Sequence, residues 1–172
     1  MTSHQGDDVP SPVSRALEVP SAAAVIAPWA EGTPGAIAAA ALRIDCGREG
    51  FARARAFTRE TLGRWSLDHC SDDAALVVTE LAANAATHAV PYAPPGDTAV
   101  WLGLAVDAAQ LIITVSDPCA GRPVRRTPAG FGLLEHGRGL SLVDALAEDW
   151  GWTPRPPAGK SVWVRLPTRS PH

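Results

Sequence analysis

Three polar residues recur at every fourth position of an alanine-rich stretch, TELAANAATHA, at residues 79–89. They are Glu80, Asn84 and His88, and in an α-helix they share one edge, because each step of four residues turns the chain by only about 40°. An asparagine carbonyl oxygen suits Mg²⁺, and a carboxylate one turn away can orient a hydroxyl for attack on a phosphoryl group. The stretch predicts phosphate chemistry on a helix; the alternative is ordinary solvated or capping residues with a packing histidine.

Two features downstream could belong to the same site. Asp117 ends the β-rich run LIITVSD, where a carboxylate can accept a hydrogen bond from the exocyclic amine of a base. The alternative is an aspartate that opens a turn before Pro118. Gly137 and Gly139 precede a predicted helix whose N-terminus favours an anion, although such glycines also serve plain turns. The GKS run at 159–161 is not a Walker A loop, because it leads into a predicted strand.

Hydrophobic periodicity predicts the elements that position the first of these residues. Residues 36–45 are predicted to form an edge strand, and residues 47–67 an amphipathic helix with apolar side chains at steps of three and four. The next helix is predicted to begin with Ser71 or Asp72 as its N-cap and to end near Ala89. This second helix carries the polar edge.

The second half of the chain is predicted to be mostly β-structure. Residues 98–117 are predicted to form a hairpin that turns near 107–109, and residues 150–167 a second hairpin. Between them lie a loop at 118–136, rich in Pro, Gly and Arg, and a short helix at 140–149. Strands and helices in this order predict an α+β or α/β sandwich, with helices on one face of the sheet.

Composition bounds the class of protein. The chain has 172 residues, of which 46% are hydrophobic, enough for one core. Its formal net charge of −3 gives no sign of a nucleic-acid or membrane-surface partner, and only Lys160 is a lysine among its 15 basic residues. Three cysteines without a CxxC pair argue against a disulfide framework or a zinc site.

The ends of the chain are expected to lie outside the domain. Residues 1–35 are rich in Pro, Ser, Ala and Gly and are predicted to be a flexible leader, followed by a domain at 36–167 and a tail at 168–172. The leader lacks the basic region of a signal peptide, and no apolar run has the length of a membrane span. We therefore expect a soluble, cytoplasmic protein.

Three segments in this order, ELAANAATHA, EHGRGLSLVDALAEDWGW and GKSVWVRLP, resemble the Bergerat-type ATP site. They are most similar to its small single-domain branch, the anti-sigma-factor serine/threonine-protein kinases of bacteria. The resemblance covers 36–167 and implies a mixed, mostly antiparallel sheet with about three helices on one face. It also implies ATP and Mg²⁺ as cofactors, an anti-sigma-factor antagonist as phosphoacceptor and a sigma factor as the regulated partner. A homodimer is possible.

The resemblance also implies roles for individual residues. Glu80 corresponds to the general base, Asn84 to the Mg²⁺ ligand, and Asp117 to the residue that reads the adenine amine. Residues 120–136 correspond to a lid over the nucleotide, and His88 to a packing residue. The other implied nucleotide contacts are Gly121, Gly137, Arg138, Gly139 and Leu140, with Arg122, Arg125 and Arg126 as further candidates for the phosphates.

One run departs from the family pattern. Where the family favours Asp-x-Gly-x-Gly, the chain has Asp117-Pro118-Cys119-Ala120-Gly121, and a Cβ at Cys119 is expected to crowd the adenine or stiffen the loop. This departure favours an alternative function, a nucleotide-gated or nucleotide-independent binding module that transfers no phosphate. The catalytic half of a histidine sensor kinase receives less support, because the sequence shows no dimerisation helices.

Overall fold

The computed structural model describes residues 36–93, 95–96, 99–123, 139–156 and 158–169. Its strands are β1 (Ala38–Ile44), β2 (Val100–Val106), β3 (Gln110–Asp117), β4 (Asp149–Pro154) and β5 (Lys160–Pro167). Its α-helices are α2 (Arg48–Arg64), α3 (Ser71–His88) and α4 (Gly139–Leu146). Two 3₁₀ turns, Asp68–Cys70 and Val90–Tyr92, flank α3.

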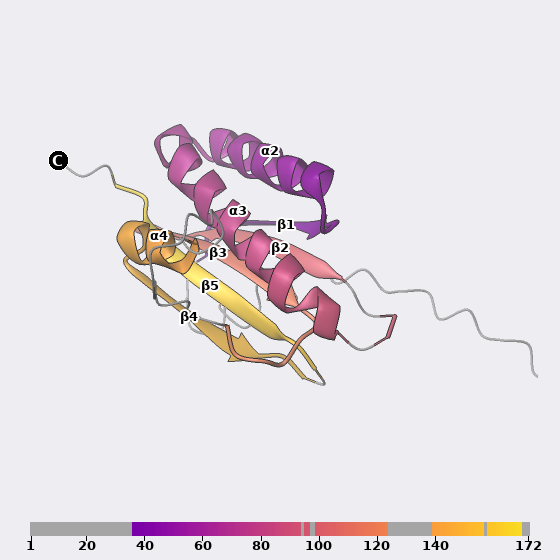
Figure 1. The fold of residues 1–172 in the computed structure, drawn as a ribbon. Helices are drawn as coiled ribbons and strands as arrows, with labels where there is room; N and C mark the ends of the chain where they lie inside the picture. Colours follow the sequence, from indigo (N-terminus) through magenta and orange to yellow (C-terminus); the bar gives the residue numbers. More distant parts are fainter. Residues whose placement is uncertain (1–35, 94, 97–98, 124–138, 157, 170–172) are drawn as a thin grey trace, which may run out of the picture.

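The five strands form one sheet in the order β1-β2-β3-β5-β4, and every neighbouring pair is antiparallel. The three α-helices lie together on one side of it (Figure 1). This confirms the predicted α+β sandwich, the edge position of β1 and both hairpins. The first hairpin turns at Asp107, whose Oδ1 accepts hydrogen bonds from the backbone N–H groups of Ala109 and Gln110 at 2.8 and 2.7 Å.

The core lies between the helices and the sheet. Leu62 of α2 and Val78 of α3 have no solvent exposure, and they belong to one apolar cluster with Leu104 of β2 and Ile113 of β3. Burying one such side chain stabilises the fold by roughly 1.5–3 kcal/mol relative to leaving it exposed. The apolar positions spaced along each helix therefore fix which edge of α3 faces the sheet.

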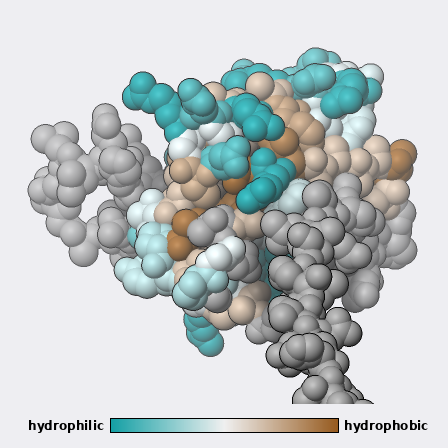
Figure 2. Space-filling model, turned by 90° about the vertical axis from the view of Figure 1, so that its right-hand side faces the viewer, coloured by the Kyte–Doolittle hydropathy of each residue, from teal (hydrophilic) through white to brown (hydrophobic). Residues whose placement is uncertain are grey.

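The outer side of α2 is polar, as its periodicity predicts. Its exposed residues include Arg48, Glu49, Arg59 and Glu60. Figure 2 shows hydrophilic side chains gathered along the top of the face in view, at the level that α2 occupies in Figure 1. The helix thus turns its charged stripe to solvent and its apolar stripe to α3 and the sheet.

Two predicted helix boundaries are wrong. Neither Ser71 nor Asp72 caps α3: the residue before the helix is Cys70, no side chain provides a cap, and the preceding 3₁₀ turn runs directly into the helix. The backbone N–H of Ser71 therefore donates to the carbonyl oxygen of Asp68. Helix α4 ends at Leu146 instead of residue 149, because the backbone N–H of Glu148 already donates to Arg165 of β5.

Several predicted features lie outside the described residues. They are the leader at 1–35, the part of the predicted loop from 124 to 136, and the last three residues of the tail. Within the described part of the chain, no helix combines the length and apolar character that crossing a membrane requires.

Candidate functional site

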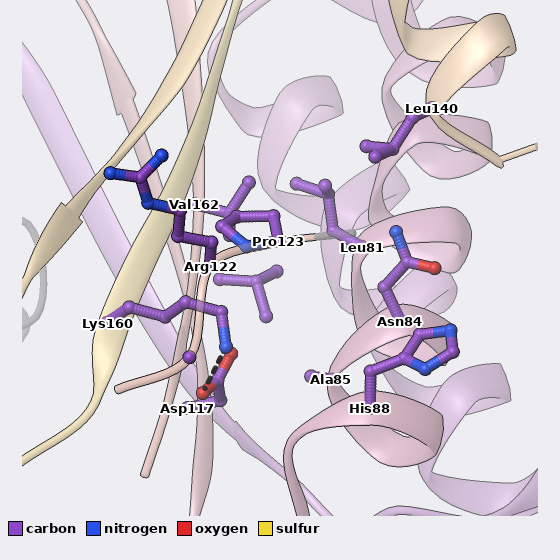
Figure 3. A pocket seen from close by; sticks show the side chains of 12 residues that line it. Leu81, Asn84, Ala85, His88, Asp117, Arg122, Pro123, Leu140, Lys160 and Val162 are labelled. Atoms are coloured by element: carbon purple, nitrogen blue, oxygen red, sulfur yellow. Dashed lines mark hydrogen bonds and ion pairs between the residues drawn. The ribbon is translucent and has the colours of Figure 1, made fainter. Parts of the chain in front are cut away.

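A partly enclosed pocket lies between α3 and the neighbouring strands β3 and β5 (Figure 3). The residues that line it are Leu81, Asn84, Ala85, His88, Val115, Asp117, Gly121, Arg122, Pro123, Leu140, Lys160 and Val162. The polar side chains stand on opposite walls, with Asn84 and His88 on the helix and Asp117 and Lys160 on the sheet. A concave, mostly apolar site with a few convergent polar groups is typical of small-molecule binding.

The helix wall comes from the stretch that first suggested chemistry. Leu81 and Ala85 are buried against the sheet, and Asn84 and His88, on the adjoining edge of α3, are half-buried and line the pocket. The Asn84 side chain has no hydrogen-bond partner in the described part of the chain, so its carbonyl oxygen is free to bind a cation. Glu80 is half-buried one turn earlier on α3, and it is not among the residues that line the pocket.

Asp117 lies at the end of β3 on the opposite wall, and its side chain is only 3% exposed. Its Oδ1 accepts a hydrogen bond of 2.9 Å from the backbone N–H of Cys119, which shapes the turn after the strand. Cys119 therefore contributes its backbone to the site, and its side chain does not line the described pocket. Its Sγ lies near the lining residue Gly121, 3.6 Å from where a Cβ would stand there, and the expected crowding of adenine by Cys119 stays a prediction.

Lys160 is the site residue that the sequence did not reveal. Its Nζ lies 3.0 Å from Oδ1 of Asp117 in an ion pair whose side chains are 6% and 3% exposed. The same Nζ donates to the carbonyl oxygen of Cys119 at 3.1 Å. The two residues meet because Lys160 stands directly opposite Asp117 in the β3–β5 register.

Burial raises the pKa of the Asp117 carboxyl above its usual value, and hydrogen bonds from Lys160 and from the backbone of Cys119 oppose this shift. The opposing interactions stabilise the charged form, in which both carboxylate oxygens are acceptors. The pair thus combines a buried carboxylate with the cation that helps to keep it ionised.

The remaining predicted residues are placed in part. Gly121, Arg122 and Leu140 line the pocket, and Gly139 is the first residue of α4. The predicted phosphate-side residues Gly137 and Arg138 lie outside the described residues, as do Arg125 and Arg126. The described chain therefore brings together Asn84, Asp117, Gly121, Arg122 and Leu140 from the predicted set.

The fold and the pocket define a helix-covered antiparallel sandwich with a small-molecule site between α3 and the sheet. A family model described as histidine kinase-like ATPase domain matches residues 48–166, and the chain belongs to this family. A comparison with curated proteins finds no match to the chain. Membership supports ATP binding and kinase-like ATPase chemistry in general, in agreement with the broader class that the sequence resembles.

Proposed function

We propose that the protein binds ATP with Mg²⁺ in this pocket and transfers the terminal phosphoryl group to a serine or threonine of an anti-sigma-factor antagonist. In this way it would control a sigma factor in the cytoplasm. The proposal is supported chiefly by one observation: Asn84 and Asp117 face the same pocket from opposite walls in a chain of the histidine kinase-like ATPase family. The motifs that resemble anti-sigma-factor kinases support the finer assignment.

Each residue has a distinct part in this mechanism. Asp117 would accept a hydrogen bond from the exocyclic amine of the base, and the carbonyl oxygen of Asn84 would hold Mg²⁺, which would supply positive charge against the phosphates. Glu80, one helical turn before Asn84, accepts the proton of the attacking hydroxyl. Catalysis would then consist mainly of positioning and electrostatic stabilisation, as in phosphoryl transfer generally.

Two measurements on single-residue variants of the site test this function. Calorimetric titration with ATP, with and without Mg²⁺, should show saturable Mg²⁺-dependent binding that weakens about tenfold or more in Asn84→Ala and Asp117→Ala. Transfer of labelled phosphate from ATP to anti-sigma-factor antagonists of the same organism should be abolished in Glu80→Ala, while most ATP binding remains. Asp72→Ala is the matched control on α3, because the side chain of Asp72 is 94% exposed.

The outcomes separate binding from catalysis. Absence of ATP binding up to millimolar concentrations would contradict the proposed site. Undiminished transfer by Glu80→Ala would remove that residue from the mechanism. ATP binding without transfer to any antagonist would favour the second candidate function, a nucleotide-gated binding module, for which the departure at Cys119 also speaks.

A further inference from the structure

The ion pair at the pocket wall leaves two polar groups unused. A lysine ammonium has three N–H donors. Two of those of Lys160 donate hydrogen bonds, one to Oδ1 of Asp117 and one to the carbonyl oxygen of Cys119. The side-chain carboxylate of Asp117 accepts two hydrogen bonds in the described chain, and Oδ1 is the acceptor in both. One N–H of Lys160 and the Oδ2 atom of Asp117 therefore have no partner there.

The free carboxylate oxygen is accessible from the pocket. Among the described residues, the side-chain polar atoms that are both shielded from solvent and without a partner are Thr114 Oγ1 and Thr153 Oγ1. Oδ2 of Asp117 is not one of them, although its residue is buried, so this atom retains contact with open space. Because Asp117 and Lys160 both line the pocket, a ligand meets an acceptor beside a donor.

We propose that Lys160 is a second base-recognition residue. Its remaining ammonium N–H donates a hydrogen bond to a ring nitrogen of adenine, and Oδ2 of Asp117 accepts a hydrogen bond from the adjacent exocyclic amine. This inference rests on the proposed binding of ATP and adds a specificity-determining residue to it. Adenine presents an amine donor next to an acceptor nitrogen on either side, N1 or N7. Oδ2 of Asp117, as an acceptor, beside the remaining N–H of Lys160, as a donor, complements this pair of groups on adenine.

Guanine fits the same wall less well. Its O6 and N1–H could meet Lys160 and Oδ2 of Asp117, but its 2-amino group places a second N–H donor next to N1–H. Oδ1 of Asp117 already accepts two hydrogen bonds, from Lys160 and from the backbone of Cys119, so only Oδ2 is left. One guanine donor would be buried without a partner, which costs about 1–3 kcal/mol.

Stability alone does not account for the ion pair. Removing two charges from water is costly, and replacing a buried ion pair by apolar residues of similar volume is often neutral or stabilising. The neighbouring positions of β5 are apolar or hydroxyl-bearing: Ser161 bonds to Ser116, and Val162 packs in the core. A lysine whose ammonium lies at the pocket wall is better explained by a ligand that uses its free donor.

The test is a cycle of two protein forms and three ligands. Calorimetry would measure ATP, 1-deaza-ATP and 7-deaza-ATP binding to the wild-type protein and to Lys160→Met, which keeps the length of the side chain without its charge. Wild type should bind one of the two deaza analogues about tenfold more weakly than ATP, because that analogue lacks the nitrogen that accepts from Lys160. In Lys160→Met this preference should disappear. Arg165→Met, on the same strand outside the lining residues, is the control and should keep it.

Several results would overturn the inference. They are equal binding of ATP and both analogues by the wild type, an unchanged preference in Lys160→Met, and tighter binding of GTP than of ATP. Lys160→Gln, which retains a donor, provides a second variant if Lys160→Met fails to fold. If the wild type binds no nucleotide at all, the proposed function fails; if it binds ATP without any effect of Lys160, only this inference fails.

A pH series tests whether the ion pair with Lys160 keeps Asp117 in its acceptor form while ATP binds. Protonation of Asp117 removes the acceptor, so ATP affinity should fall as the pH is lowered, and the fall should begin at a higher pH in Lys160→Met, which loses the cation opposing the raised pKa of Asp117. Other charged or titratable groups near Asp117 are Arg155, which lowers the same pKa, and Cys46, whose pKa is raised by burial and also by the charge of Asp117. His88 and Arg122 also line the pocket, and His88 could itself titrate in this pH series. Both proteins therefore carry His88→Gln, and identical pH profiles would contradict the coupling of Lys160 to the acceptor form of Asp117.

Discussion

The Asp117–Lys160 pair depends on the glycine that precedes the lysine. Gly159 has a φ of +108°, a conformation that side chains with a Cβ rarely adopt, and a Cβ there would lie 2.5 Å from the carbonyl oxygen of Asp117. The turn therefore brings the start of β5 against the end of β3 at a distance that only glycine permits. The geometry of the pocket wall is set by a residue that does not touch the pocket.

We expect Gly159→Ala to lower the free energy of unfolding by about 1–3 kcal/mol, since it combines a strained φ with a backbone clash. Urea denaturation measures this loss, and calorimetry should show weaker ATP binding by the folded variant. Gly47→Ala is the control, because Gly47 has an extended backbone with φ of −174° and nothing within 4 Å of the added Cβ. Equal stability of the two variants would contradict the role of this turn.

Single residues of the site were predictable to different degrees. The spacing of Asn84 on its helix and the strand-end position of Asp117 are local features, and the structure places both at the pocket. Their roles remain predictions. The partnership of Asp117 with Lys160 joins residues 43 positions apart, and it depends on the register of two strands that are not consecutive in the chain. In the sequence, Lys160 stands out only because it is the single lysine, which gives no indication of a role in the site.

At the scale of the elements, fully buried apolar side chains of α2 and α3 hold these helices against the sheet. We expect Leu62→Ala in α2 to lower the free energy of unfolding by about 2–5 kcal/mol, because Leu62 has no exposure and truncation leaves a cavity. Leu76→Ala in α3 removes the same atoms from a side chain that is 41% exposed and should cost less than about 1 kcal/mol. Similar losses in the two variants, measured by urea denaturation, would contradict this account of the core.

The elements themselves were largely predictable, and their ends were not. Apolar periodicity located α2, α3 and both hairpins, because the burial that stabilises these elements depends on apolar residues that recur at a regular spacing along the sequence. The beginning of α3 was missed because the preceding 3₁₀ turn supplies a backbone acceptor where a side-chain cap was expected. The end of α4 was missed because Glu148 bonds to β5, a contact that only the folded chain creates.

At the scale of the whole molecule, a ligand that binds only the folded protein raises its stability by mass action. We expect ATP with Mg²⁺, at about 100 times its dissociation constant, to raise the free energy of unfolding by about 2.7 kcal/mol, visible as a higher Tm. In Asn84→Ala the gain should shrink and no longer depend on Mg²⁺. A Tm that stays constant as ATP and Mg²⁺ are added would contradict binding to the folded state.

The class of the whole molecule was predictable because several weak motifs occur in one order along the chain, and the family match at 48–166 agrees with it. The finer assignment to an anti-sigma-factor kinase concerns partner proteins. Recognition of a partner depends on surface shape and charge, which vary without altering the motifs of the nucleotide site. Phosphate transfer to a defined antagonist is therefore the measurement that decides it.

The order of strands in the sheet also has a consequence for biosynthesis. β5 lies between β3 and β4, although it is the last strand along the described chain. As the chain leaves the ribosome, the wall that carries Asp117 emerges well before the strand that carries Lys160. A nascent chain stalled before residue 160 would hold the carboxylate without its ammonium partner and would lack the strand that completes the pocket. We therefore expect nucleotide to stabilise the chain only after the hairpin of β4 and β5 has been made.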